Sequence, residues 1–241
     1  MRDQPTFRPP LWRLPTTEID RRRTLAGFVG ILGAGFMPLR AAAQTGTCVL
    51  TPDAGEGPFY FDPELVRSDI TEGAPGAPLE LTLRVVRVGD CATLDGARVD
   101  VWHADALGLY SGYARQPGTG EPLPSVEGRT FLRGTQFTSS DGEVVFRTIY
   151  PSWYGGRTPH VHFKVFLGGD EVVASQLFFP DDVNDEVFSE WEPYRERRER
   201  RRTFNSNDSF LRDGRVEGAF CDVERVEEGF RAHVTVAVRQ G

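Results

Sequence analysis

The sequence predicts an all-β domain, a β-sandwich of two mostly antiparallel sheets with long active-site loops. From Thr51 onward, short alternating or apolar runs are separated by clusters of Gly, Pro, Asp and Asn. Helix-length segments with a 3.6-residue apolar period are missing between these runs, which argues against a parallel α/β sheet. A chain of 241 residues with 39% hydrophobic and 11% aromatic residues has the composition of an ordinary globular protein.

The first 43 residues have the layout of a cleavable export signal. Arginines 21–23 precede fifteen mostly apolar residues, Leu25–Leu39, and the small residues Ala41–Ala43 follow. This apolar run is shorter than the roughly 20 residues that cross a bilayer, so we predict removal of residues 1–43 and no stable membrane insertion. The arginines resemble a twin-arginine signal; a general secretory signal is the alternative. The mature domain, residues 44–241, is then periplasmic or extracellular.

Six segments of the mature chain predict strands. In order they are 79–88, 97–105, 143–151, 160–167, 171–179 and 232–238. Gly168-Gly169-Asp170 supplies the positive φ angles of a tight hairpin between the fourth and fifth of these strands. Segments 106–130 and 180–212 are rich in Gly, Pro, Asp and Arg and weakly patterned, so we predict that they are loops over the sandwich. Long ordered loops are usually functional.

Charge and cysteine content exclude some functions. Without residues 1–43 the chain has 21 basic and 32 acidic residues, a net charge of −11. Nucleic acid is therefore not an expected partner, because phosphate binding needs clustered Lys and Arg. The basic run Arg195–Phe204 predicts a solvated turn or helix. Cys48, Cys91 and Cys221 fit no metal-binding spacing; one disulfide and one free thiol are expected after export, and three pairings are possible.

Two of the four histidines lie two residues apart in a predicted strand. Successive side chains of a strand point to opposite faces, so His160 and His162 share one face, about 7 Å apart, and the apolar residues between and after them face the core. Such a pair can converge on one metal ion. The pair alone also suits two structural histidines that face solvent or bond to the backbone.

Several motifs around the histidine pair resemble the intradiol ring-cleavage dioxygenases, the family of protocatechuate and catechol dioxygenases. In the family's order they are EGPFY (56–60), LVRSDI (65–70), DVWHADALGLYSGY (100–113), the segment 131–165 and SQLFFP (175–180). The resemblance implies a non-haem Fe(III) ion, one per chain, held by Tyr110, Tyr154, His160 and His162. Tyr113 and Tyr150 are the competing tyrosines.

These residue types suit ferric iron. A phenol has a pKa near 10, and only a strongly acidic cation makes its anion the favoured ligand, whereas zinc prefers thiolates and carboxylates. The resemblance also implies that Tyr154 takes a substrate proton and that Arg157 stabilises negative charge on the substrate ring. Gln176 is expected to bond to this arginine or to the substrate. We predict that His103 is structural, and His233 has no assigned role.

The resemblance implies an enzyme that uses O₂ to cleave a catechol-type ring between its two hydroxylated carbons, giving a cis,cis-muconate-type dicarboxylate. Two other functions remain open. One is a non-catalytic exported β-sandwich that binds a ligand and has structural histidines. The other is a cupin-like Fe(II) or copper oxygenase, which needs a glutamate and a third histidine downstream, where only His233 stands. Catechol-type members carry a helical dimerisation segment, but only about a dozen residues separate Ala43 from EGPFY, too few for packed helices. The particular catechol and the oligomeric state stay open.

Overall fold

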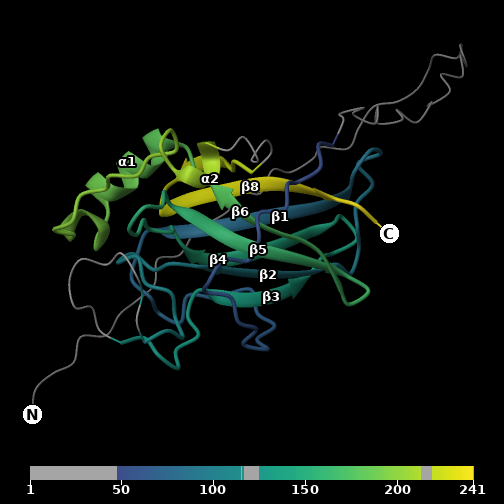
Figure 1. Ribbon diagram of the computed structural model, residues 1–241, viewed down its shortest axis with the longest axis horizontal. Coiled ribbons are helices and arrows are strands. Elements are labelled where there is room, and N and C mark those ends of the chain that lie inside the picture. The colour runs from purple at the N-terminus through teal and green to yellow at the C-terminus, as the bar shows by residue number, and fades with distance from the viewer. Residues whose placement is uncertain (1–47, 115, 117–124, 213–218, 241) are drawn as a thin grey trace, which may run out of the picture. The chain divides into compact units, whose positions relative to one another are not determined.

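The computed structural model describes residues 48–114, 116, 125–212 and 219–240, and in them eight strands form two four-stranded sheets (Figure 1). The first sheet has the order β4-β1-β8-β7 and the second the order β3-β2-β5-β6. All neighbouring strands are antiparallel except β1 and β8, which are parallel. The predicted export signal at 1–43 lies outside the described residues.

The strands of both sheets contribute one continuous core. The first sheet contains β1 (Pro78–Arg87), β4 (Glu143–Ile149), β7 (Asp222–Val226) and β8 (Gly229–Val238). The second contains β2 (Arg98–His103), β3 (Arg133–Phe137), β5 (His160–Leu167) and β6 (Asp170–Phe178). Alternate residues from both sheets, among them Leu81, Phe146, Val234, Val101, Phe163 and Leu177, form a single buried cluster. The predicted β-sandwich is confirmed.

All six predicted strands are present, with each end within three residues of its predicted position, and Gly168 and Gly169 make the hairpin turn with φ of +60° and +100°. Strands β3 and β7 were not predicted. The sequence of β3 contains Gly134, where a methyl group would come within 2.6 Å of Ile70 Cγ2, so packing requires a residue that weakens the strand pattern. Strand β7 is a mostly exposed edge strand with an acidic start.

The prediction that 180–212 is all loop is wrong. It contains helix α1 (Asp181–Glu190), a 3₁₀ turn η1 (Tyr194–Glu196) and the short helix α2 (Ser209–Arg212). Helix α1 begins after Pro180 with two acidic residues in its first turn, a charge that the helix dipole favours. Helix α1 packs on the core through Val187, which is fully buried in it. None of the helices in the described residues is long and apolar enough to cross a membrane.

A segment near the start of the described chain connects the two sheets. Cys48 forms a disulfide with Cys91, and Cys221 is a buried free thiol. The amide of Thr51 donates to Ala237 O on β8 (2.9 Å), and the amide of Ala54 donates to Ala174 O on β6 (2.7 Å). We call residues 51–61 the strap. These bonds lead the strap from β8 of the first sheet to β6 of the second.

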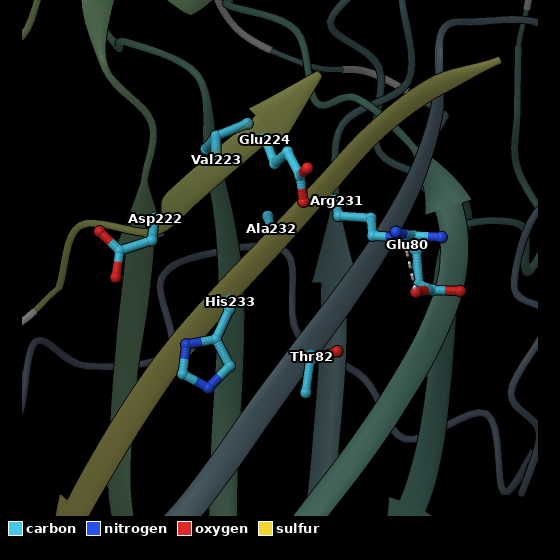
Figure 2. Close-up of a pocket in the computed structure, with 8 residues that line it drawn as sticks. All are labelled: Glu80, Thr82, Asp222, Val223, Glu224, Arg231, Ala232 and His233. Atoms are coloured by element: carbon cyan, nitrogen blue, oxygen red, sulfur yellow. Dashed lines mark ion pairs between the residues drawn. The ribbon is translucent and has the colours of Figure 1, made fainter. Parts of the chain in front are cut away.

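The outer face of the first sheet holds a shallow pocket of about 330 Å³ (Figure 2). Its lining includes His233, which stands opposite Thr82 of β1 and Asp222 of β7. Strand β5 with the histidine pair belongs to the other sheet. His233 therefore belongs to a different sheet from the histidine pair.

Candidate metal centre

Strand β5 presents both paired histidines on the outer face of the second sheet. The alternate residues Val161, Phe163 and Val165 are fully buried in the sandwich core, as the period-two pattern predicts. His160 and His162 are 1% exposed, and their Nε2 atoms lie 3.1 Å apart. The strand therefore brings two imidazole nitrogens to one point.

Two tyrosines reach the same point from separate loops. The hydroxyl oxygens of Tyr110 and Tyr154 each lie 3.2 Å from His160 Nε2. Tyr110 lies beyond β2 and Tyr154 beyond β4. Gly108 lets the loops meet, because a methyl group there would lie 2.5 Å from Trp153 O and its φ is +87°. The structure thus brings together the four predicted ligands.

Hydrogen bonding gives His160 the tautomer that a metal ligand needs. Its Nδ1 lies 2.7 Å from the carbonyl of Thr158, which only accepts, so Nδ1 carries the proton and Nε2 presents its lone pair to the two hydroxyls. Burial lowers the pKa of His160 and of His162 well below the usual value, which keeps both rings neutral. Burial raises the pKa of the phenols of Tyr110 and Tyr154.

The donor set fits a hard, highly charged cation. Distances of 3.1–3.2 Å from His160 Nε2 to the other three atoms suit donors that share one ion at about 2 Å each. The described residues contain no cluster of three or more His, Cys, Asp or Glu side chains that could hold a metal. Buried phenols with raised pKa values lose their protons only to a strongly Lewis-acidic ion, so ferric iron fits these residues better than zinc.

Arg157 stands beside the four donor atoms and is held by two partners. Its Nη1 lies 3.5 Å from His160 Nε2, and its Nη2 donates to Gln176 Oε1. Its Nε donates to Asp208 Oδ2 at 3.0 Å, and the fully buried Asp208 also accepts from the amide of Thr158 at 2.9 Å. The predicted contact between Arg157 and Gln176 is present. Sequence reasoning did not find Asp208, because it lies in the weakly patterned segment 180–212, 51 positions from Arg157 and 50 from Thr158.

The other tyrosines and histidines have different partners. Tyr113 donates its hydroxyl proton to Tyr60 O at 3.1 Å, and Tyr150 donates to Asn184 Oδ1 of α1 at 2.9 Å. His103 is buried, with Nε2 2.7 Å from Thr148 Oγ1 and Nδ1 2.9 Å from Ala104 O. The side chains of Tyr113, Tyr150 and His103 thus bond to groups other than the four predicted ligands.

The strap covers the donor atoms. The Phe59 ring stacks on Tyr110, with centroids 4.5 Å apart, and meets Tyr154 edge-on at 6.2 Å. Tyr60 packs against Trp102, whose indole stacks on His162. These strap residues belong to the EGPFY motif, but the sequence pattern alone gave them no role at the site.

Comparisons with known proteins identify the family of the chain. Residues 54–190 match the family model described as Dioxygenase, which gives the class of the chain. An intradiol ring-cleavage dioxygenase from Tetranychus urticae has a similar structure, with a TM-score of 0.72 and 30% identity over 80% of this chain and 95% of that one. The chain belongs to the intradiol ring-cleavage dioxygenase family.

More distant relatives are longer. The chain is 27% identical over 188 residues to a catechol 1,2-dioxygenase of Acinetobacter guillouiae, across 65% of this chain and 58% of the relative. It is 29% identical over 156 residues to a hydroxyquinol 1,2-dioxygenase of a Rhizobium species, across 55% of this chain and 50% of the relative. The chain thus spans between half and three fifths of the length of these two relatives.

Proposed function

We propose that the protein is a ferric dioxygenase that cleaves a catechol-type ring between its two hydroxylated carbons with O₂, giving a cis,cis-muconate-type dicarboxylate. The observation that carries the proposal is the convergence of two neutral imidazoles and two phenols, with Tyr110 Oη, Tyr154 Oη and His162 Nε2 within 3.1–3.2 Å of His160 Nε2. Family membership supports the same reaction.

The ion would be held by Tyr110, Tyr154, His160 and His162. When bound, Fe(III) would supply a Lewis-acidic centre that draws electron density from a catechol ring, so that O₂ would react with the organic substrate. Burial keeps His160 and His162 neutral, so that their nitrogens can bind the ion, and the Phe59 ring holds Tyr110 by stacking.

The two tyrosines differ in how firmly they are held. Tyr110 is 1% exposed, its ring stacks on Phe59, and its amide donates to Gln116 Oε1 at 2.6 Å. Tyr154 is only partly buried, and the Arg157 charge opposes the effect of burial on the pKa of its phenol. We therefore assign to Tyr154 Oη the base that accepts a proton from the substrate hydroxyl.

Arg157 supplies a fixed positive charge. Because Asp208 and Gln176 hold its guanidinium, it does not need to reorganise when negative charge develops on the substrate ring. Its Nη1 lies 3.5 Å from His160 Nε2, so this charge acts at the donor cluster itself. The arginine stabilises the transition state in this proposal and takes no proton.

The proposal is tested by product analysis under ¹⁸O₂. Protein loaded with Fe(III) is incubated with catechol, and mass spectrometry should find a dicarboxylate that has gained both atoms of ¹⁸O₂ in addition to the two catechol oxygens. An aldehyde product would instead indicate a cupin-like oxygenase that cleaves beside the hydroxyls. Catechol binding without O₂ uptake would indicate a non-catalytic binding module. Either result contradicts the proposed reaction.

We also propose that residues 1–43 export the domain. The Cys48–Cys91 disulfide supports this location, because such bonds persist in oxidising compartments. Mass spectrometry of the protein recovered from each cell fraction checks the proposal. We expect a chain without residues 1–43 outside the cytoplasm, and a full-length chain confined to the cytoplasm would contradict the proposal.

A further inference from the structure

We propose that Trp102 is a positioning residue for the metal ligand His162, and that it orients this imidazole by ring stacking in place of a hydrogen bond. The inference rests on the proposed function, since it concerns a ligand of the proposed iron site. It assigns a role to a residue outside the four ligands and outside the group of Arg157, Gln176 and Asp208.

The two histidines are oriented in different ways. His160 is fixed by the hydrogen bond from Nδ1 to Thr158 O at 2.7 Å, the usual arrangement for a histidine that binds metal through Nε2. The Nδ1 atom of His162 is equally buried, but within the described part of the chain it has no hydrogen-bond partner. Some other contact must set the rotation of the His162 ring.

Trp102 provides that contact. Its indole lies nearly parallel to the His162 ring, with centroids 5.0 Å apart and 11° between the planes. The two residues stand directly opposite each other on β2 and β5, so the sheet fixes their separation. Both side chains are 1% exposed. A rotation of the imidazole out of its present plane would break this stack and meet the indole.

The Trp102 indole is itself held in place by Tyr60. The Tyr60 ring packs on Trp102 with centroids 4.7 Å apart, and the Tyr60 hydroxyl donates to Asp100 Oδ2 at 2.9 Å. The Lys164 ammonium lies 4.0 Å from the centroid of the Tyr60 ring. His162, Trp102, Tyr60 and Lys164 thus form one continuous row of contacts, in which the His162–Trp102 pair is stacked and the Tyr60 ring is tilted by 55° against the indole.

The strap closes the edge of the same imidazole. Gly57 has φ of +72°, and a methyl group at this position would come within 3.1 Å of His162 Cε1. The ring is therefore confined at its face by Trp102 and at its Cε1 edge by the Gly57 backbone. Neither contact involves a hydrogen bond to Nδ1. They explain how His162, whose Nδ1 has no hydrogen-bond partner among the described residues, keeps its Nε2 directed at the donor cluster.

The test compares three substitutions in the iron-loaded protein. Trp102→Leu removes the ring face, Trp102→Phe keeps a ring face, and Phe146→Leu is the control for lost core volume in the other sheet. Two quantities are measured: the visible tyrosinate-to-iron absorption band, and the rate at which iron passes to excess chelator. Should Trp102→Leu not fold, Trp102→Met takes its place, because its unbranched, flexible side chain fills irregular gaps without a ring.

For Trp102→Leu we expect iron loss about 10–100 times faster than in wild type and an altered absorption band, as for other groups that orient metal-bound histidines. Trp102→Phe should stay close to wild type, and so should Phe146→Leu. If the Leu or Met variant loses iron no faster than Phe146→Leu, Trp102 has no positioning role. If wild-type protein itself binds no iron and shows no band, the proposed function fails and this inference fails with it.

Discussion

Replacing Asp208 with asparagine should weaken both the fold and the reaction. The carboxylate is fully buried and accepts hydrogen bonds from Arg157 Nε (3.0 Å), the Thr158 amide (2.9 Å) and the Phe210 amide (2.8 Å). Removing one partner of a buried ion pair costs about 3–5 kcal/mol. The lower end applies, because the Arg157 side chain is 18% exposed and keeps Gln176, so we expect a loss of about 3 kcal/mol.

For a domain of this size, a loss of 3 kcal/mol lowers the melting temperature by about 6–12 °C. Circular dichroism during heating measures that shift, and urea unfolding gives the free energy directly. Steady-state ring cleavage should slow by about 10²-fold, because Arg157 is no longer held in place.

The matched control is Asp185→Asn. Asp185 is 65% exposed and pairs with Arg201 at 3.1 Å, and Arg201 keeps Asp181 at 2.9 Å. This substitution should change stability by less than about 1 kcal/mol. If Asp208→Asn is no less stable than Asp185→Asn and cleaves its substrate at the wild-type rate, the assigned role of Asp208 is wrong.

Three further predictions concern the disulfide, a buried histidine and the proposed base. Cys48→Ser opens a loop of 43 positions and should cost about 4 kcal/mol in urea unfolding; equal midpoints for oxidised and reduced wild type would contradict this. Burial lowers the pKa of His103 from 6.5 to about 4. Between pH 6.5 and pH 4, His103 is therefore protonated in the unfolded chain and neutral in the folded one. Stability should therefore fall by about 3 kcal/mol as the pH falls from 6.5 to 4. His103→Gln should lessen this fall, and unfolding curves with the same pH dependence as wild type would count against it. Tyr154→Phe should lower kcat for ring cleavage by about 10²–10⁴-fold, and an unchanged kcat would exclude it as the base.

Local patterns predicted the sandwich because most strands bury one face. The alternation of β5 alone placed His160 and His162 opposite Val161 and Phe163, as the structure shows. Strand β3 was not predicted because it contains Gly134, a glycine that packing requires. Strand β7 was not predicted because most of its side chains are exposed. Helix α1 was not predicted because it has few apolar residues; its buried residues are Asn184 and Val187.

The site was predictable only where the family's motifs carry it. Those motifs selected Tyr110 and Tyr154, and the structure brings both hydroxyls to 3.2 Å from His160 Nε2. Asp208 and Trp102 were not assigned roles, because their contacts are made between distant segments. Trp102 meets His162 only through the pairing of β2 with β5, and Asp208 meets Arg157 only after the segment that contains α1 folds back.

The visible spectrum and iron content of the purified protein test the proposed ferric site most directly. Tyr113→Phe is the control, because that hydroxyl bonds to Tyr60 O and not to the donor cluster. We expect one iron per chain with a tyrosinate-to-iron band in wild type and Tyr113→Phe, and a shifted or lost band in Tyr110→Phe. A colourless, iron-free wild-type protein after growth with ample iron, or a band that Tyr110→Phe leaves unchanged, would contradict it.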